Sequence, residues 1–248
     1  MARIFPLSEG TFTIGHDKLF VPFDEQTHEL TDRPTGSLLV EVQPFLAATA
    51  DDVVLFDTGL GFNAEDGELQ IHKNIRGAGF TPEQVTKVLL SHLHKDHAGG
   101  VTRKDANGVV ATSFPNAEYY IYRAEADFAL EKGYPSYIPE ELEPMLTSGQ
   151  VRWLDGKQGQ IGSKICFEHS GGHCPQHIVF LLKDEEGSYF FGGDEAPQLK
   201  QMKMKYVAKY DYDGKRAMAL REEYAGRGRE AGWQFMFYHD IKMPVARL

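Results

Sequence analysis

Short apolar runs, each ended by glycine, proline or acidic residues, predict buried β-strands along the whole chain. The clearest of these predicted strands are residues 37–42, 52–56, 88–90, 117–122 and 233–238. Two further runs flank an Asp-Glu-Glu-Gly turn and are expected to pair as a hairpin, residues 178–182 and 188–191. The pattern therefore predicts strands from one end of the chain to the other.

Helical patterns are fewer and lie between some of the strands. Residues 123–132 and 215–231 predict helices, and a short helix is expected to begin near Thr81, which can cap it, with Pro82 in its first turn. Four long stretches are expected to be loops, residues 15–36, 61–80, 134–149 and 194–212. Strands separated by helices only in places favour an α/β fold, in which two sheets pack face to face with helices outside.

Length and composition narrow this picture to one domain. The 248 residues, 42% of them hydrophobic, can bury a sizeable core. Because the chain shows neither an internal repeat nor a Pro/Gly/Ser-rich linker, residues 1–248 are predicted to form a single domain. No stretch approaches the roughly 18 apolar residues of a membrane span. The net charge of −10 disfavours nucleic acid or an anionic membrane as a partner.

Two features predict a cytoplasmic location. The first residues lack the apolar core and the small-residue cleavage site of a secretory signal. The two cysteines, Cys166 and Cys174, are too few for a disulfide framework and suit a reducing compartment.

Ten histidines are the compositional feature that calls for an explanation. Four potential metal ligands lie within six residues, His92, His94, Asp96 and His97. Residues two apart in an extended segment point the same way, so His92 and His94 can bind one ion. Asp96 and His97 follow in a turn and can address a second ion. Imidazole and carboxylate together suit zinc, iron, manganese or cobalt. The alternative, a solvated polar turn after a strand, explains the grouping less well.

Other potential ligands follow predicted strands elsewhere in the chain. His173 lies in a turn that glycines begin, Asp194 follows a Gly-Gly pair, and His239 follows the last strand. Asp57 comes directly after the strand 52–56. In this order and with these spacings, the motifs resemble those of the metallo-β-lactamase superfamily across nearly the whole chain. The resemblance implies that family's fold, a four-layer αββα sandwich of two mixed sheets with helices outside.

The resemblance also implies roles for the motif residues. It assigns three residues to a first metal ion, His92, His94 and His173. It assigns three residues to a second ion, Asp96, His97 and His239, with Asp194 bridging the two. The ions are expected to be two divalent cations, zinc before iron, manganese or cobalt. A hydroxide shared by two ions roughly 3.5–4 Å apart would be the nucleophile, and Asp96 or Asp194 would carry the proton to the leaving group.

Two further residues are expected to support the ligands from behind. Asp57 is predicted to accept a ring N–H from a ligand histidine and thereby to fix the position of its proton. His177 is expected to support His173.

Within the superfamily, the segment after Asp194 resembles the branch of acyl-homoserine lactonases and methyl parathion hydrolase-like enzymes. That branch implies attack on a lactone or ester carbonyl, or on a phosphotriester, in a small-molecule substrate. One position departs from it, because Pro197 stands where lactonases often carry a tyrosine that polarises the substrate. Tyr206, Tyr210 or Tyr212 is an alternative source of that hydroxyl.

Two other functions are compatible with the same fold. One is an iron-dependent oxidoreductase similar to persulfide dioxygenases, which the second set of ligands disfavours because those enzymes use a single iron. The other is a non-catalytic sensor that keeps its metals for stability, which the intact ligand set disfavours. The sequence leaves open whether the chain forms a homodimer. The sequence therefore predicts a dinuclear hydrolase.

Overall fold

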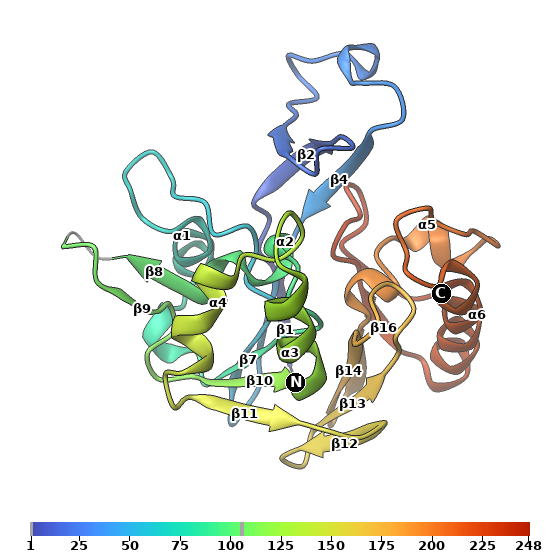
Figure 1. The fold of residues 1–248 in the computed structure, drawn as a ribbon. Helices are drawn as coiled ribbons and strands as arrows, with labels where there is room; N and C mark the ends of the chain where they lie inside the picture. Colours follow the sequence, from blue (N-terminus) through green and yellow to red (C-terminus); the bar gives the residue numbers. More distant parts are fainter. Residues whose placement is uncertain (1, 105–106) are drawn as a thin grey trace.

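Two six-stranded mixed sheets lie face to face, and helices cover their outer faces (Figure 1). The structure, a computed structural model, describes residues 2–104 and 107–248. The predicted α/β sandwich is therefore confirmed.

The first sheet has the strand order β1-β5-β6-β7-β10-β11. Its strands are β1 (Arg3–Pro6), β5 (Phe45–Ala48), β6 (Val53–Phe56), β7 (Lys87–Leu89), β10 (Glu118–Tyr122) and β11 (Val151–Leu154). Strands β6, β7, β10 and β11 are parallel to one another, whereas β5 pairs antiparallel with both β1 and β6. Because β6 and β7 are parallel, the residues after both strands reach the same edge of the sheet.

The second sheet has the order β12-β13-β14-β15-β16-β17. Its strands are β12 (Gln158–Ile161), β13 (Ile165–His169), β14 (Ile178–Asp184), β15 (Gly187–Phe191), β16 (Gln234–Met236) and β17 (Val245–Ala246). The antiparallel pair β14 and β15 confirms the predicted hairpin. Strands β15 and β16 are parallel, so the segments that follow them leave the sheet at one edge, where the β13–β14 connection also lies.

Two smaller sheets extend the sandwich. One has three strands, β2 (Gly10–Ile14), β3 (Phe20–Pro22) and β4 (Leu38–Val42). It projects from the body of the molecule and continues into the 3-10 helix η1 (Leu30–Asp32) at the top of Figure 1. The other is the hairpin of β8 (Thr102–Lys104) and β9 (Val110–Thr112).

Six α-helices and three more 3-10 helices complete the described chain. The α-helices are α1 (Gln70–Gly77), α2 (Lys95–Ala98), α3 (Arg123–Lys132), α4 (Pro139–Leu146), α5 (Leu199–Met202) and α6 (Gly214–Ala231). The 3-10 helices are η2 (Pro82–Gln84), η3 (Gly99–Val101) and η4 (Gly193–Glu195). Helix α3 has the predicted bounds, and η2 begins after Thr81 with a capping box to Gln84. Helix α6 begins one residue before its predicted start, and Asp213 caps it by accepting from the Arg216 N–H.

The prediction of four long loops is wrong in part. Residues 61–80 contain α1, 134–149 contain α4, 194–212 contain η4 and α5, and 15–36 contain β3 and η1. Helices α1 and α4 are only 8 residues long, so packing and not intrinsic propensity decides whether they form. Each buries an apolar pair one turn apart against the first sheet, Ile71 with Ile75 and Leu142 with Met145.

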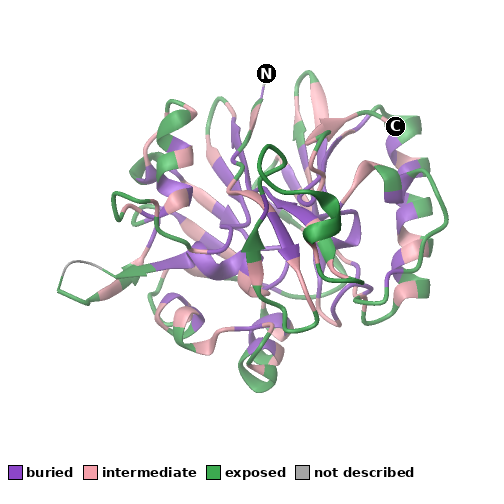
Figure 2. Ribbon diagram, turned by 90° about the horizontal axis from the view of Figure 1, so that it is seen from above, coloured by how far each residue is buried: buried purple, intermediate pink, exposed green. Residues whose placement is uncertain are grey.

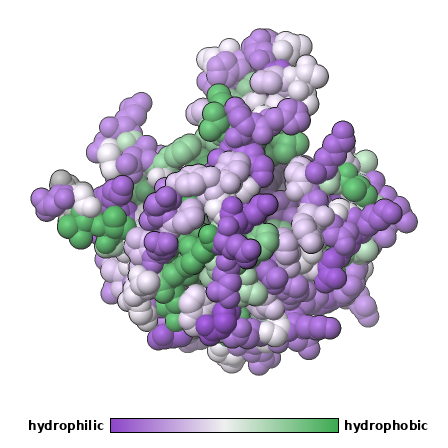
Figure 3. All heavy atoms as spheres, viewed as in Figure 1, coloured by the Kyte–Doolittle hydropathy of each residue, from purple (hydrophilic) through white to green (hydrophobic). Residues whose placement is uncertain are grey.

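Residues that face the space between the layers are buried, and exposed residues lie on the outer faces of the helices (Figure 2). Between the two sheets, Phe45 and Phe56 contact Phe191, and Phe56 also meets Phe180. The face of the molecule that Figure 3 shows is mostly hydrophilic and carries separate apolar patches. Among the described helices, none combines the length and apolar character needed to cross a membrane.

Candidate metal centre

Loops from both sheets deliver the candidate ligands to one edge of the sandwich. His92 and His94 follow β7, and the short helix α2 carries Asp96 and His97. The second sheet contributes the rest: His173 from the β13–β14 connection, Asp194 from η4 after β15, and His239 from the turn after β16. All seven residues that the sequence analysis assigned as ligands lie together, His92, His94, Asp96, His97, His173, Asp194 and His239.

The first group of ligand atoms consists of three ring nitrogens and one carboxylate oxygen. His94 Nδ1 lies 2.9 Å from His92 Nε2 and 3.2 Å from His173 Nε2. The Oδ2 atom of Asp194 lies 3.2 Å from the same His173 nitrogen. Such a set, with atoms all within 4.8 Å of one another, has the composition of a zinc site.

The second group lies on the other side of Asp194. The Oδ1 atom of Asp194 lies 3.1 Å from His97 Nε2 and 3.0 Å from His239 Nε2. The Oδ2 atom of Asp96 lies 3.6 Å from each of these two nitrogens. Asp194 therefore presents one oxygen to each group, which is the arrangement of a bridging carboxylate.

Two buried atoms at the junction of the groups test whether metal ions fit. His97 Nε2 and Asp194 Oδ1 are both buried and face each other at 3.1 Å, but neither makes a hydrogen bond of acceptable geometry to a described residue. A buried polar atom without a partner costs roughly 1–3 kcal/mol, so such atoms are rare unless a ligand satisfies them. Imidazole and carboxylate are ligands that divalent zinc, iron, manganese and cobalt accept. The residues therefore fit two divalent metal ions.

Asp57 supports the second group from behind. Its Oδ2 atom accepts a hydrogen bond from His97 Nδ1 at 2.7 Å and another from Ser91 Oγ at 2.7 Å. The Ser91 N–H donates to the other oxygen of Asp57 at 2.7 Å. With Nδ1 bearing the proton, His97 presents a lone pair on Nε2 to the centre. Asp57 adopts φ 55°, a left-handed conformation that aspartate and asparagine tolerate better than most residues.

Backbone carbonyls orient two more ligands. His239 Nδ1 donates to the Glu41 carbonyl at 2.6 Å, which directs Nε2 toward Asp194. The Tyr238 hydroxyl donates to the Asp96 carbonyl at 2.5 Å, and its ring stacks on His97 with centroids 4.0 Å apart. These contacts join segments far apart in the sequence, so no local motif announces them.

His177 lies behind the centre but has another partner than the expected one. Its Nε2 atom accepts from the Asp194 backbone N–H at 3.2 Å, and its Nδ1 bonds with Ser170 Oγ at 2.9 Å. The described contacts of His173 do not include a hydrogen bond to His177; the two rings lie 6.0 Å apart. His177 therefore holds the backbone that carries the bridging carboxylate.

Three buried acids at the site were not found from the sequence. Asp211 Oδ1 accepts from His173 Nδ1 at 3.1 Å. Glu195 Oε2 accepts from the His173 N–H at 3.3 Å, and Glu125 Oε1 accepts from the Leu93 N–H at 3.0 Å. None of the three has the sequence spacing of a metal ligand, and only its contacts across the fold show its position.

Charge and burial divide the titrating groups of the metal-free centre into two sets. Burial, together with neighbouring histidines, lowers the pKa of His92 and His94 well below the usual value. Burial also opposes charge on His97, but Asp194 and Asp96 outweigh it and raise the pKa of His97 well above the usual value. Conversely, burial would raise the pKa of Asp194, but His239, His97 and His173 hold it well below the usual value. Without metal, the centre thus combines neutral His92 and His94 with a protonated His97 and an ionised Asp194, and His97 would release its proton on binding a metal ion.

Of the three tyrosines considered for substrate polarisation, Tyr210 lies nearest to a ligand. Its ring centroid is 5.9 Å from that of His173, and its hydroxyl accepts from Gln201 Nε2 at 3.1 Å. Tyr212 is 73% exposed. Tyr206 uses its backbone carbonyl to accept from Arg221.

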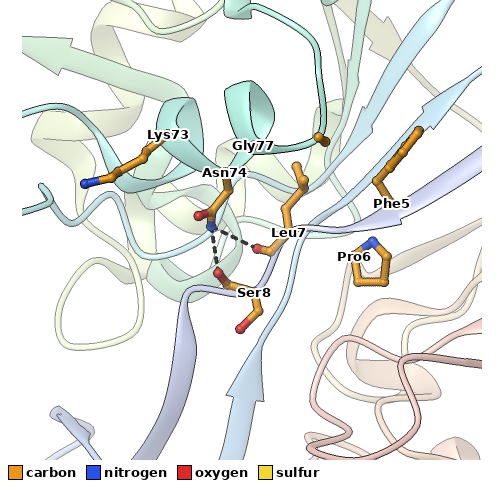
Figure 4. A pocket seen from close by; sticks show the side chains of 8 residues that line it. Phe5, Pro6, Leu7, Ser8, Lys73, Asn74 and Gly77 are labelled. Atoms are coloured by element: carbon orange, nitrogen blue, oxygen red, sulfur yellow. Dashed lines mark hydrogen bonds between the residues drawn. The ribbon is translucent and has the colours of Figure 1, made fainter.

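A surface pocket elsewhere does not compete with this site. Figure 4 shows Phe5, Leu7, Lys73 and Asn74 around it, with the Asn74 amide already bonded to the backbone carbonyls of Leu7 and Ser8. Its lining contains neither histidine nor carboxylate, so it lacks the groups for metal or acid–base chemistry.

Two facing mixed sheets with two His/Asp clusters at one edge define an α/β sandwich protein with a candidate site for two metal ions. The model of the metallo-beta-lactamase superfamily matches residues 37–244. The chain therefore belongs to the metallo-beta-lactamase superfamily.

Individual relatives are more distant. The lactamase-like protein notP of Aspergillus sp. (strain MF297-2) is 28% identical over 150 residues, 60% of this chain and 37% of that protein. The match thus spans well under half of this fungal relative. An N-acyl homoserine lactonase of Bacillus sp is 26% identical over 191 residues, 67% of this chain and 70% of that enzyme.

Solved structures share the fold. The structure of AidC, described as a dizinc quorum-quenching lactonase, has a TM-score of 0.73 and 20% identity. The superposition covers 99% of this chain and 90% of AidC.

Proposed function

We propose that this protein is a dinuclear metal-dependent hydrolase that opens lactones or cleaves carboxylic esters of small molecules. The observation that carries the proposal is the position of Asp194, whose two oxygens each face a separate group of ligand atoms. The similarity to an N-acyl homoserine lactonase and to a dizinc lactonase supports this choice of substrate class. Phosphotriesters are a second substrate class for the same chemistry.

The residues present would hold two ions, zinc being the preferred metal. His92, His94 and His173 would hold the first, and Asp96, His97 and His239 the second, with Asp194 shared. When bound, such ions lower the pKa of water toward neutrality and polarise a carbonyl oxygen. Apart from the shared carboxylate, the ligands of the first ion would all be neutral imidazoles. They would therefore compensate little of the positive charge of that ion.

Asp194 and Asp96 differ in how closely the ligand histidines surround them, and therefore in how readily they can carry a proton. Asp194 lies within 3.0–3.2 Å of three histidines, so its oxygens are committed to holding both groups together. Asp96 lies farther, 3.6 Å from two of them. We therefore assign proton transfer to the leaving alcohol to Asp96 and the bridging role to Asp194.

Tyr210 is the residue that we assign to the substrate carbonyl, in place of a tyrosine at position 197. Its ring lies beside His173, and its hydroxyl has a donor to spare because the bond from Gln201 uses it as an acceptor. A hydroxyl aimed at developing oxyanion charge stabilises the transition state more than the ground state.

The test combines metal analysis with a hydrolysis panel. We expect about two equivalents of zinc per chain and turnover of acyl-homoserine lactones, simple lactones or aryl esters, both lost on chelation. His239→Ala should lose one equivalent and most activity, whereas His16→Ala, at an exposed histidine outside the centre, should retain both. One metal per chain together with a fully active Asp194→Ala variant would contradict the proposal. Oxygen consumption with thiol persulfides, in place of hydrolysis, would favour an oxidoreductase.

A further inference from the structure

A buried ionic group lies directly behind His173, on the side away from the other ligands. It consists of Asp211, Arg221 and Glu195, whose side chains are at most 2% exposed. Ionised side chains are almost never buried this completely unless they are paired. The burial of these charged side chains needs an explanation. Their contact with the metal-ligand candidate His173 suggests one.

The contact between Asp211 and His173 is specific to one nitrogen of the ring. Asp211 Oδ1 lies 3.1 Å from His173 Nδ1, while His173 Nε2 faces Asp194 and His94. An ionised carboxylate can only accept hydrogen bonds, so this contact places a proton on Nδ1, and in the neutral ring that binds a metal ion the lone pair is then on Nε2. That lone pair points toward the first group of ligand atoms.

Arg221 compensates the charge of Asp211 and ties it to the fold. Its Nη1 lies 3.7 Å from Asp211 Oδ2 and donates to the Glu195 carbonyl at 3.3 Å. Its Nη2 donates to the Tyr206 carbonyl at 2.7 Å. Because Arg221 belongs to α6, the longest helix among the described residues, the carboxylate rests on a rigid element.

The backbone of the same segment is paired with the backbone around His173. The Tyr212 N–H donates to the His173 carbonyl at 2.9 Å, and the Asp213 N–H donates to the Gly172 carbonyl at 2.8 Å. Glu195 accepts the Gly172 and His173 N–H groups from the other side. The main chain of His173 is therefore fixed without Asp211, and Asp211 is left to set the ring.

We infer that Asp211 is a positioning residue for the metal centre, which orients the His173 ring and fixes its proton on Nδ1, with Arg221 as its counter-charge. This inference rests on the proposed function, because it presupposes metal binding by the first group. Carboxylates that hold the outer nitrogen of a metal-binding histidine commonly change metal affinity about 10- to 100-fold when they are replaced.

Asp211→Asn is the informative variant because it keeps the shape of the side chain and removes its charge. If the amide oxygen accepts from His173, the amide NH₂ faces the Arg221 guanidinium, so two donors meet. We expect the affinity for one of the two zinc equivalents to fall about 10- to 100-fold and that for the other to stay within about twofold.

The experiment is a chelator-competition titration of the metal-free chain with Zn²⁺, with melting temperatures of the metal-free forms measured in parallel. Asp213→Asn is the matched control, since it makes the same chemical change two residues away at the exposed cap of α6. It should lower the melting temperature slightly and leave both zinc affinities unchanged. The absorption spectrum of the Co²⁺-loaded chain should change in Asp211→Asn and not in Asp213→Asn.

Two outcomes overturn the inference while leaving the proposed function intact. In one, Asp211→Asn binds both equivalents as the parent chain does; in the other, it weakens both equally in proportion to lost stability. Asp211→Glu guards against misfolding, because it keeps the charge facing Arg221 but displaces the carboxylate by one methylene. It should also weaken one equivalent and leave the other unchanged, and the melting temperature of its metal-free form shows how much stability the extra methylene costs. A parent chain that binds no zinc overturns the proposed function, and this inference with it.

Discussion

Asp57 Oδ2 accepts a hydrogen bond from His97 Nδ1 at 2.7 Å, and this contact turns the other nitrogen of His97 toward Asp194. Asp57 directly follows β6, and His97 lies in α2, which follows the adjacent parallel strand β7. The topology of the sheet thus brings together a ligand and the carboxylate that sets its proton, although they are 40 residues apart.

Replacing Asp57 should weaken the second metal site. Asp57→Asn keeps a residue that tolerates φ 55° but loses the charge behind His97, so we expect the affinity for one metal equivalent to fall about 10- to 100-fold. Asp57→Ala should lower the free energy of unfolding as well, by about 1–2 kcal/mol, because alanine is strained in this conformation. Metal titration and denaturant unfolding separate the two effects. Equal metal affinities in Asp57→Asn and the parent chain would count against this role.

The ligands were predictable because their pattern is local. Four of them lie within residues 92–97, and the others directly follow turns or strands that the hydrophobic pattern already marks. Asp211 was not predictable as a partner of His173, because the two lie 38 residues apart and lone acids occur throughout an acidic chain. Contacts of this kind depend on how the sheets pack, which local periodicity does not encode.

The same distinction between local pattern and packing explains which helices are predictable from the sequence. The 10-residue pattern of α3 predicts a helix, whereas the pattern predicts loops where α1 and α4 form. Helix α4 even contains Pro144, which costs helix stability in isolation. Burial of Leu142 and Met145 against the rest of the core outweighs that local cost, and only the folded structure supplies it.

Removing the Tyr210 hydroxyl should slow turnover without removing metal. Tyr210→Phe keeps the ring beside His173, so we expect the zinc content to be unchanged and kcat for lactone hydrolysis to fall about 10- to 100-fold. Tyr212→Phe is the matched control, because Tyr212 is 73% exposed, and its kcat should match that of the parent. Steady-state kinetics on zinc-loaded enzymes distinguish the two variants. A Tyr210→Phe enzyme as fast as Tyr212→Phe would remove Tyr210 from the mechanism.

Gly59 is required by close packing as well as by its backbone conformation. It has φ +77°, and a Cβ atom there would come within 2.4 Å of the Glu9 carboxylate. Gly67 has φ +83° with open space around it. Gly67→Ala should therefore cost about 1 kcal/mol of unfolding free energy, from backbone strain alone. Gly59→Ala should cost about 1–3 kcal/mol more, from the clash. Urea unfolding of both variants measures the difference, and equal losses would show that the packing at Glu9 relaxes freely.

Glu9 itself should make the metal-free chain less stable as the pH rises. Burial is the main cause that raises the pKa of Glu9 to about 8, although one oxygen accepts from the Leu60 N–H at 2.7 Å. In the unfolded chain the pKa of a glutamate is about 4.3, so the folded state binds the proton more tightly. The contribution of the protonated Glu9 side chain to the free energy of unfolding is therefore complete below about pH 4 and is lost as the pH rises toward about 8.

Glu9→Gln mimics the protonated carboxyl and removes this dependence. Relative to the variant, the parent should lose on the order of 1–3 kcal/mol of unfolding free energy between about pH 5 and pH 8. Glu65→Gln, at an exposed glutamate, serves as the control and should follow the parent at every pH. Urea unfolding of the three metal-free chains across this range is the measurement. Parallel pH profiles for Glu9→Gln and the parent would mean that Glu9 ionises in the folded chain without penalty, as it would if water reached its second oxygen.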